Sequence, residues 1–80
     1  MTTIIGIKTT DRIENAVLIQ SVLTKFGCFI KTRIGLHDKI DGLCSPKGVI
    51  LLEVIDDAQA KELLSTLCEI DGIELQEMIF

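Results

Sequence analysis

The chain has few of the residues that build sites for aromatic rings and nucleic acids. Its 80 residues include no Trp, no Tyr and only three Phe, which leaves little surface for stacking a base. The 8 basic residues are outnumbered by 12 acidic ones, and the net charge is -4. Neutralising a phosphate backbone needs clustered Lys and Arg, whereas the basic residues here are spread singly. The composition therefore argues against direct binding of nucleic acid.

Long apolar runs are missing as well. The longest are short, such as Val49-Ile50-Leu51-Leu52, whereas a membrane-spanning helix needs about 18 apolar residues. The first residues lack the basic segment, apolar stretch and cleavage site of a secretory signal. Three cysteines without a CxxC pair are more typical of a reducing compartment than of a disulfide framework. We therefore expect a cytoplasmic protein.

Aliphatic residues, in contrast, are abundant. Ile, Leu and Val together occupy 27 of the 80 positions, far more than a disordered chain carries. We expect a single folded domain over residues 1–80. A domain of this size buries only about 60–65% of the surface that its unfolded chain exposes. There is no room for a deep enzymatic cleft together with a separate cofactor domain.

The spacing of the apolar residues changes along the chain and predicts alternating strands and helices. Strands are expected over 3–9, 28–35, 48–55 and 73–80, and helices over about 11–26 and from 56 or 57 to about 70. Asp11 with Glu14 resembles a capping box at the start of the first helix, and Gly27 is expected to end it in a left-handed conformation. Asp56 or Asp57 is expected to cap the second helix. The stretch 36–47, which contains Gly42 and Ser45-Pro46, is expected to be irregular.

This order predicts an α+β fold of ferredoxin-like type. Strand, helix, strand, strand, helix, strand is a split βαβ arrangement, and right-handed crossovers place both helices on one face of a four-stranded antiparallel sheet. The first helix is expected to bury one apolar face, which consists of Ile13, Ala16, Val17, Ile19, Val22, Leu23 and Phe26. The second helix is expected to bury Ala60, Leu63, Leu64, Leu67 and Cys68.

The other face of the sheet has nothing in this chain to cover it. Alternation along each strand directs Ile5, Ile7, Ile30, Ile34, Ile50, Leu52 and Val54 toward the helices. It directs the apolar residues Ile4, Phe29, Val49 and Leu51 away from them, among charged residues that include Arg33. We hypothesise that these four residues form the interface of a homo-oligomer, a dimer or a tetramer. The alternative is that they are aliphatic residues on a solvated face, which small sheets commonly carry.

Few residues suggest a ligand site. The turn Thr9, Thr10, Asp11 and Arg12 precedes a helix, whose N-terminal amides attract anions and carboxylates, and Arg33 can add a bidentate contact. These five residues are the predicted small-ligand site, although capping alone also explains Asp11. His37 and Cys44 lie in the irregular stretch and are weak candidates for a metal site shared across an oligomer interface, because a metal needs three or four ligands.

Catalysis is not indicated. A nucleophile needs an adjacent base, the only histidine is His37, and no serine lies in a GxSxG motif. No phosphate-binding GxGxxG or GxxxxGK motif is present either. We expect no enzymatic activity and no cofactor.

The chain resembles the ACT-like iron-only hydrogenase system regulators, a family of small ferredoxin-like regulatory proteins. The resemblance lies in four segments that span almost the whole chain: Asp11-Arg12, Arg33-Ile34-Gly35, Val49-Ile50-Leu51-Leu52, and Leu63, Leu67, Ile70, Gly72 and Ile73. It implies an oligomeric regulatory or sensing module that binds a small effector or a partner protein. The chain differs from the family in the stretch 36–47, which is longer than the usual hairpin.

Two hypotheses of function follow. The first is a non-enzymatic regulatory module that forms homo-oligomers and binds a small effector or a partner protein, with a link to iron-only hydrogenase regulation. The alternative is a metal-responsive sensor that uses His37 and Cys44 of two copies.

Overall fold

The fold is known from a computed structural model, which describes residues 2–9, 13–40 and 43–80. Side chains are described for these residues except 13, 14, 37–40 and 43–47. The elements follow the chain as β1 (Thr3–Thr9), α1 (Ile13–Lys25), the 3₁₀-helix η1 (Gly27–Phe29), β2 (Ile30–Ile40), β3 (Leu43–Val54), α2 (Asp57–Leu67) and β4 (Glu74–Ile79). The predicted βαββαβ order is confirmed.

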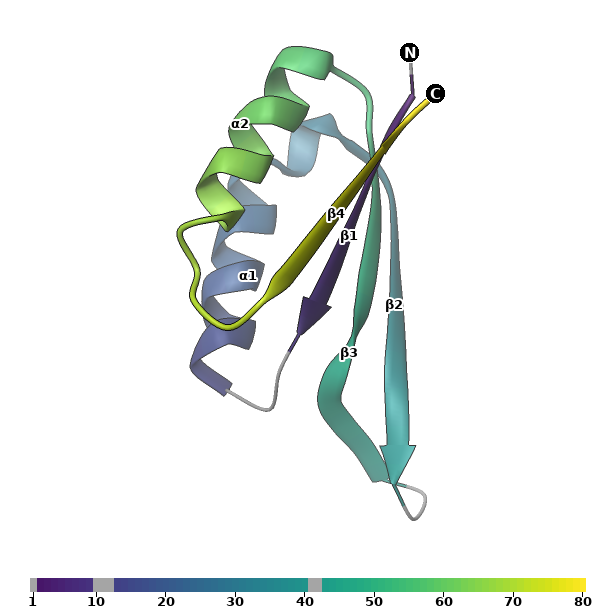
Figure 1. The fold of residues 1–80 in the computed structure, drawn as a ribbon, viewed down its shortest axis with the longest axis vertical. Coiled ribbons are helices and arrows are strands. Elements are labelled where there is room, and N and C mark those ends of the chain that lie inside the picture. The colour runs from purple at the N-terminus through teal and green to yellow at the C-terminus, as the bar shows by residue number, and fades with distance from the viewer. Residues whose placement is uncertain (1, 10–12, 41–42) are drawn as a thin grey trace.

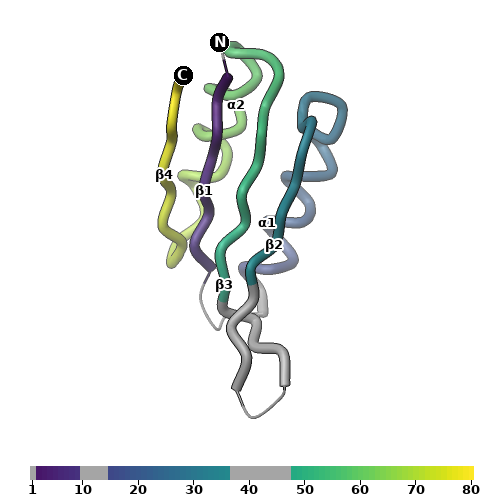
Figure 2. The backbone as a smooth tube through the Cα atoms, turned by 90° about the vertical axis from the view of Figure 1, so that its right-hand side faces the viewer, coloured from purple at the N-terminus to yellow at the C-terminus, as the bar shows by residue number. Residues whose placement is uncertain are grey.

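The four strands form one antiparallel sheet in the order β2-β3-β1-β4. Both helices lie on the same side of this sheet (Figure 1), and Figure 2 shows the strands in front with α1 and α2 behind them. The two ends of the chain meet, because Phe80 donates a backbone hydrogen bond of 2.9 Å to Thr2 and accepts one of 3.4 Å from it. The predicted ferredoxin-like arrangement is therefore confirmed.

The core lies between the sheet and the helices. It consists of Ile5, Ile7, Ile19, Leu23, Phe26, Leu52, Val54, Ala60, Leu63 and Leu67. Strands β1 and β3 contribute alternate residues and each helix one stripe, as the periodicity of the sequence predicts. Two predicted members of the stripe on α1 are exposed instead: Ala16 and Val17. Helix α1 therefore buries a narrower face than its sequence indicates.

Neither helix ends at a glycine as predicted, since α2 already ends at Leu67, with Cys68 as its C-cap. Gly27 does not adopt a left-handed conformation; it begins η1, and α1 leads directly into this short helix. Gly72, which follows α2, has a φ of 85°, in the region where a side chain is unfavourable. Asp71-Gly72 thus forms a turn that leads into β4, several residues after α2 has ended.

The stretch 36–47 is not the irregular loop that its Gly and Pro residues predict. Strands β2 and β3 continue through most of it, and the backbone pairs Lys39–Cys44 and Ile40–Leu43 extend the ladder. The register shifts between His37 and Lys39, opposite Ser45-Pro46. Because a proline in a sheet is tolerated at a bulge, Pro46 fits a ladder that is interrupted and then resumes. The β2–β3 hairpin extends beyond the other strands (Figure 1).

The start of α2 is fixed by Asp56. Its carboxylate accepts a hydrogen bond of 3.1 Å from the backbone amide of Gln59, which otherwise has no partner within the helix. Of the two residues predicted to cap this helix, Asp56 and Asp57, Asp56 is the cap.

Replacing this cap should weaken the fold measurably. We expect Asp56→Ala to lower the free energy of unfolding by about 1 kcal/mol, measured by urea denaturation. Asp56→Asn is the matched control, because the amide oxygen accepts the same hydrogen bond, and its stability should stay close to that of the wild type. An equal loss in both variants would show that Asp56 acts through its charge and not as a cap.

Candidate functional site

One side of the sheet is left uncovered and carries a group of apolar side chains. Residues that pair across antiparallel strands share a face, and Ile5, Ile7, Leu52 and Val54 occupy the helix side. The alternate residues therefore define the opposite side, which we call the open face. Its apolar members are Ile4, Ile34, Leu36, Val49, Leu51 and Met78, and they come from all four strands.

The position of Ile34 and Leu36 on the open face depends on an irregularity in β2. The backbone of Ile30 pairs with that of Val54, and the backbone of Thr32 pairs with that of Glu53. Lys31 is therefore an extra residue in β2 whose backbone has no pairing partner on β3. Such a bulge reverses the alternation of the residues that follow it. Ile34 is consequently 48% exposed and Leu36 53% exposed. The prediction that Ile34 points toward the helices is wrong.

Phe29 also differs from its prediction. It lies in η1 and not in a strand, and it packs against the hydrophobic core. Its backbone N–H donates to the carbonyl of Phe26 at 2.9 Å, and its own carbonyl accepts from the N–H of Ile55 at 3.0 Å. These bonds hold Phe29 at the end of the sheet. Of the four predicted interface residues, Ile4, Val49 and Leu51 have the predicted orientation.

Polar groups border the apolar part of the open face. Glu53 accepts a hydrogen bond of 3.3 Å from Thr32 Oγ1 and lies 3.9 Å from the Nζ atom of Lys31. A shallow hollow of about 230 Å³ lies beside Glu53, lined by Ile4, Ile34 and Leu51 among others. At the other end of the sheet, Lys8 pairs with Val49 and with Glu74. An apolar centre with a polar rim is the usual composition of a protein interface.

The predicted small-ligand site is described only in part. Thr10, Asp11 and Arg12 lie outside the described residues. The hydroxyl of Thr9 donates a hydrogen bond of 3.1 Å to the carbonyl of Gly48. Arg33 pairs with Leu52 on the helix side of the sheet, because of the bulge at Lys31, and not on the open face.

Within one chain, Arg33 does not lie next to Thr9. Thr9 pairs with Gly48, four residues along β3 from Leu52, which is about 13 Å at 3.3 Å per residue. The ligand site with all five residues therefore stays a prediction that depends on a second copy or on residues outside the described ones.

The metal hypothesis is likewise untested at its two residues. The backbone of His37 pairs with Gly48 and that of Cys44 with Lys39, so the two are not direct cross-strand partners. Their side chains lie outside the described ones. Among the side chains that are described, no three His, Cys, Asp or Glu residues are close enough to hold a metal ion.

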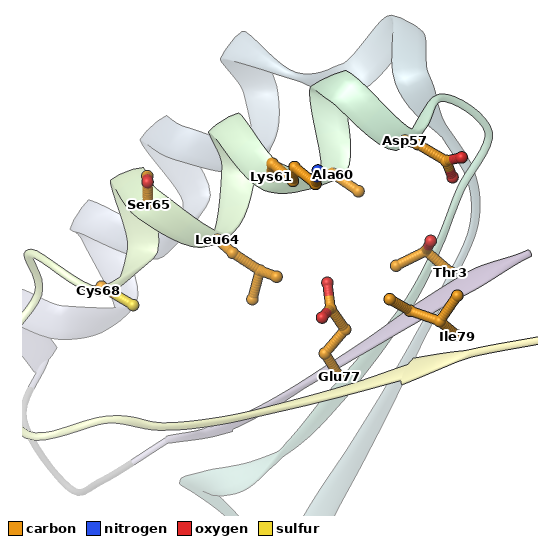
Figure 3. A pocket seen from close by; sticks show the side chains of 9 residues that line it. All are labelled: Thr3, Asp57, Ala60, Lys61, Leu64, Ser65, Cys68, Glu77 and Ile79. Carbon is orange, nitrogen blue, oxygen red and sulfur yellow. The ribbon is translucent and has the colours of Figure 1, made fainter.

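A second concave region, absent from the predictions, lies between α2 and β4. Figure 3 shows Leu64 extending from α2 toward the sheet and Glu77 extending from β4 toward the helix. This groove has a volume of about 510 Å³, within the range of ligand pockets. Asp57 lies at one end and Cys68, an exposed free thiol, at the other. Cys68 was expected on the buried face of the helix, and that expectation is wrong.

One signal for this groove is present in the sequence. Glu77 occupies the same alternation as Leu75 and Ile73, which predicts a carboxylate on the helix side of the last strand. What the sequence does not reveal is that, among the strands, α2 packs mainly against β1 and β3 and less against β4. The edge of the sheet at β4 is left partly uncovered as a result. No helix in the described part of the chain is long and apolar enough to cross a membrane.

The chain is similar to known proteins in its fold. No family model and no curated protein matches it. Among solved structures, it is similar to the uncharacterized protein TM1266 from Thermotoga maritima, with a TM-score of 0.81 and 20% identity over 96% of this chain and 92% of the other.

Two further structures show how widely this fold is used. The ACT domain from GTP pyrophosphokinase of Chlorobium tepidum matches with a TM-score of 0.64 and 19% identity over 98% of this chain and 97% of that one. The de novo designed protein Foldit4 matches with a TM-score of 0.69 and 13% identity over 100% and 99%. Because a designed protein shares the fold, the fold alone does not define a function. The comparisons show that this chain has an ACT-like, ferredoxin-like fold.

Proposed function

We propose that this chain is a non-enzymatic regulatory module that forms homo-oligomers through its open face and binds a small effector or a partner protein. The observation that carries the proposal is the open face itself. Half-exposed Ile34, Leu36 and Met78 surround Ile4 and Leu51 there, with polar groups at both ends. Covering such a group with a partner gains about 25 cal/mol per Å² of apolar surface, before the costs of association.

A second copy of the chain suits this face because each end of it carries a cation and a carboxylate: Lys8 with Glu74 at one end, and Lys31 with Glu53 at the other. Lys8 lies at one end of β1, whereas Glu53 pairs with Ile4 at the other end. Two sheets stacked with their strands in opposite directions place each Lys8 near the Glu53 of the other copy. Such a two-fold contact uses the same surface twice and closes on itself.

The regulatory part of the proposal is supported by resemblance. The chain resembles the iron-only hydrogenase system regulators and has the fold of the ACT domain from GTP pyrophosphokinase. The link to hydrogenase regulation depends on the resemblance alone. Clustering of the gene with hydrogenase maturation genes would support that link, and a housekeeping neighbourhood would count against it.

The effector can be sought directly by a thermal-shift screen with amino acids, nucleotides and divalent metals. A compound that binds the folded state raises the melting temperature, and the shift grows with the ratio of its concentration to its Kd. A shift with an amino acid or a nucleotide would support a small effector. A shift with a metal that is lost in His37→Ala would instead favour the metal-responsive alternative.

Homo-oligomerisation through the open face can be tested with one charge. We expect Leu36→Lys to shift the protein toward the 8.8 kDa monomer, because the change places a cation in the apolar contact. Multi-angle light scattering over a range of concentrations measures this shift. The matched control is Leu18→Lys on α1, since Leu18 is 50% and Leu36 53% exposed.

The control variant Leu18→Lys should remain oligomeric. Both Leu18→Lys and Leu36→Lys should unfold at about the same urea concentration as the wild type. A wild-type chain that stays monomeric at all concentrations, or an oligomer that survives Leu36→Lys, would refute the proposed interface.

A further inference from the structure

The groove between α2 and β4 is long and narrow. Its wall on α2 is one stripe of the helix, from Asp57 through Ala60, Lys61, Leu64 and Ser65 to Cys68. Eleven residues of helix correspond to about 17 Å, and the five steps from Glu74 to Ile79 correspond to about 17 Å of strand. The residues of β4 that line the groove are Glu77 and Ile79, at the end of the strand that lies beside Thr3 of β1. An extended chain fits this shape better than a compact molecule does.

The strand that borders the groove also has a free edge. In the described sheet, β4 pairs only with β1, so its outer backbone N–H and C=O groups have no strand partner. Edge strands are often protected by proline, lysine, a bulge or an inward-pointing charge, and Glu77 is the one inward-pointing charge of β4. The sequence of β4, ELQEMI, has neither proline nor lysine, and its pairing with β1 is regular. The outer edge of β4 is thus available to a strand that brings an opposite charge to Glu77.

The side chains at the groove set the chemistry of such a strand. On the helix side of β4, Glu77 lies between Leu75, which packs against the hydrophobic core, and Ile79, which lines the groove. Asp57 adds a second carboxylate, and Lys61 is the one cation among the groove residues. No ion pair within the described residues joins these three groups. The groove therefore has an excess of negative charge, and on β4 its carboxylate lies between two apolar positions of the strand.

We propose that an extended segment of a partner protein adds to β4 as a fifth strand and places a basic side chain beside Glu77. Strand addition supplies main-chain hydrogen bonds for affinity and alternate side chains for specificity. The added strand then follows the pattern apolar, any, basic, any, apolar, in which the two apolar residues and the basic residue face the helix. The basic group meets Glu77, and the two apolar groups enter the groove beside Leu64 and Ile79.

A second copy of the chain meets these requirements less well through its own β4. That strand carries Glu74 and Glu77 and no cation, so pairing two β4 strands gives Glu77 no opposite charge. The groove lies on the helix side of the sheet, opposite the open face. This inference rests on the proposed function only in taking the partner to be a protein, and it does not require the homo-oligomer.

The test uses a fluorescent peptide, Thr-Val-Thr-Lys-Thr-Val-Thr, whose binding is followed by fluorescence anisotropy. A second peptide has Glu in place of Lys. We expect the Lys peptide to bind the wild type about fivefold more tightly than the Glu peptide, and Glu77→Lys to reverse this preference. Glu62→Lys on α2 is the matched control, because it changes the net charge equally outside the groove and should leave the preference in place.

Two further peptides test strand addition itself. In a strand, the N–H groups of alternate residues point to the same edge. One peptide carries N-methyl groups on Val and Lys, and the other carries them on Thr. Only one of the two patterns should abolish binding. Hydrogen exchange should slow at the amides of β4 when the Lys peptide is bound, and those of β2 should not change.

The experiment separates this inference from the proposed function when it is repeated on the monomeric Leu36→Lys variant, which should bind the Lys peptide as the wild type does. Equal binding of the Lys and Glu peptides, equal effects of the two N-methyl patterns, or protection away from β4 would overturn the inference. An oligomer that Glu77→Lys dissociates would show that a second copy, and not a partner peptide, occupies the groove.

Discussion

Leu63→Ala is expected to lower the free energy of unfolding by about 4 kcal/mol. Leu63 lies on α2 with no exposed surface and belongs to the core between the sheet and the helices. Truncating a buried leucine removes its transfer free energy and leaves a cavity, at a cost of about 2–5 kcal/mol. A domain of 80 residues has a total stability of only about 4–12 kcal/mol. The variant should therefore be close to unfolding at ordinary temperatures.

The neighbouring residue provides the control. Leu64 is partly buried and lines the groove beside β4, so we expect Leu64→Ala to cost about 1–2 kcal/mol. Urea denaturation at one protein concentration measures both variants, in the monomeric Leu36→Lys background, because oligomerisation adds a concentration-dependent stability. Equal losses in the two variants would mean that the groove is closed over Leu64 in solution.

Leu63 also illustrates which parts of the fold can be predicted from the sequence. Ala60, Leu63 and Leu67 repeat at helical spacing, and Ile5 and Ile7 alternate as in a strand. In each case one periodicity holds along the whole element, so the buried face follows from it directly. These five residues are buried as predicted.

The bulge at Lys31 could not be predicted from a single sequence. Residues Cys28 to Gly35 alternate regularly, and nothing in them marks Lys31 as the extra residue. Whether a strand accommodates an extra residue depends on its pairing with β3 and on the position of η1, which are tertiary features. A shift of one residue exchanges the two faces of a strand, and for this reason the prediction for Ile34 failed.

The prediction for the β2–β3 hairpin failed for a different reason. Ser45-Pro46 and Gly42 are local turn signals, and for this reason the stretch 36–47 was predicted to be irregular. The ladder to Ile40 and Leu43 depends on two strands that continue each other's pairing, which outweighs the local preference. Predictions from Gly and Pro are weakest where a neighbouring strand is already in place.

The two candidate surfaces lie on opposite sides of the same sheet. The open face derives its apolar centre from β1, β2, β3 and β4, whereas the groove depends on β4 and α2. A copy of the chain on the first surface and a partner strand on the second do not compete for residues. Because β4 contributes to both, with Met78 on the open face and Glu77 in the groove, adding a strand to β4 can change how the open face associates.

Asn15→Asp is expected to destabilise the protein by about 3 kcal/mol at neutral pH. Asn15 is 5% exposed on α1, and its Nδ2 atom donates a hydrogen bond of 2.9 Å to the carbonyl of Asp71. This bond ties the first helix to the turn after α2. Aspartate has the same shape, but its carboxylate has no hydrogen to donate. The substitution therefore places a buried negative charge against a carbonyl oxygen, which costs more than the loss of a neutral bond.

The effect should depend on pH with a sign that identifies its cause. Burial raises the pKa of the introduced carboxyl group above that of the unfolded chain. The penalty is present at pH values above this raised pKa and is relieved as the pH falls through it, because the protonated acid can again donate to the carbonyl of Asp71. Asn15→Leu is the uncharged control, with a smaller loss and the same pH dependence as the wild type. Urea denaturation between neutral and mildly acidic pH distinguishes the two variants, and an Asn15→Asp deficit that does not shrink on acidification would show that the Asn15–Asp71 bond does not hold the helices in place.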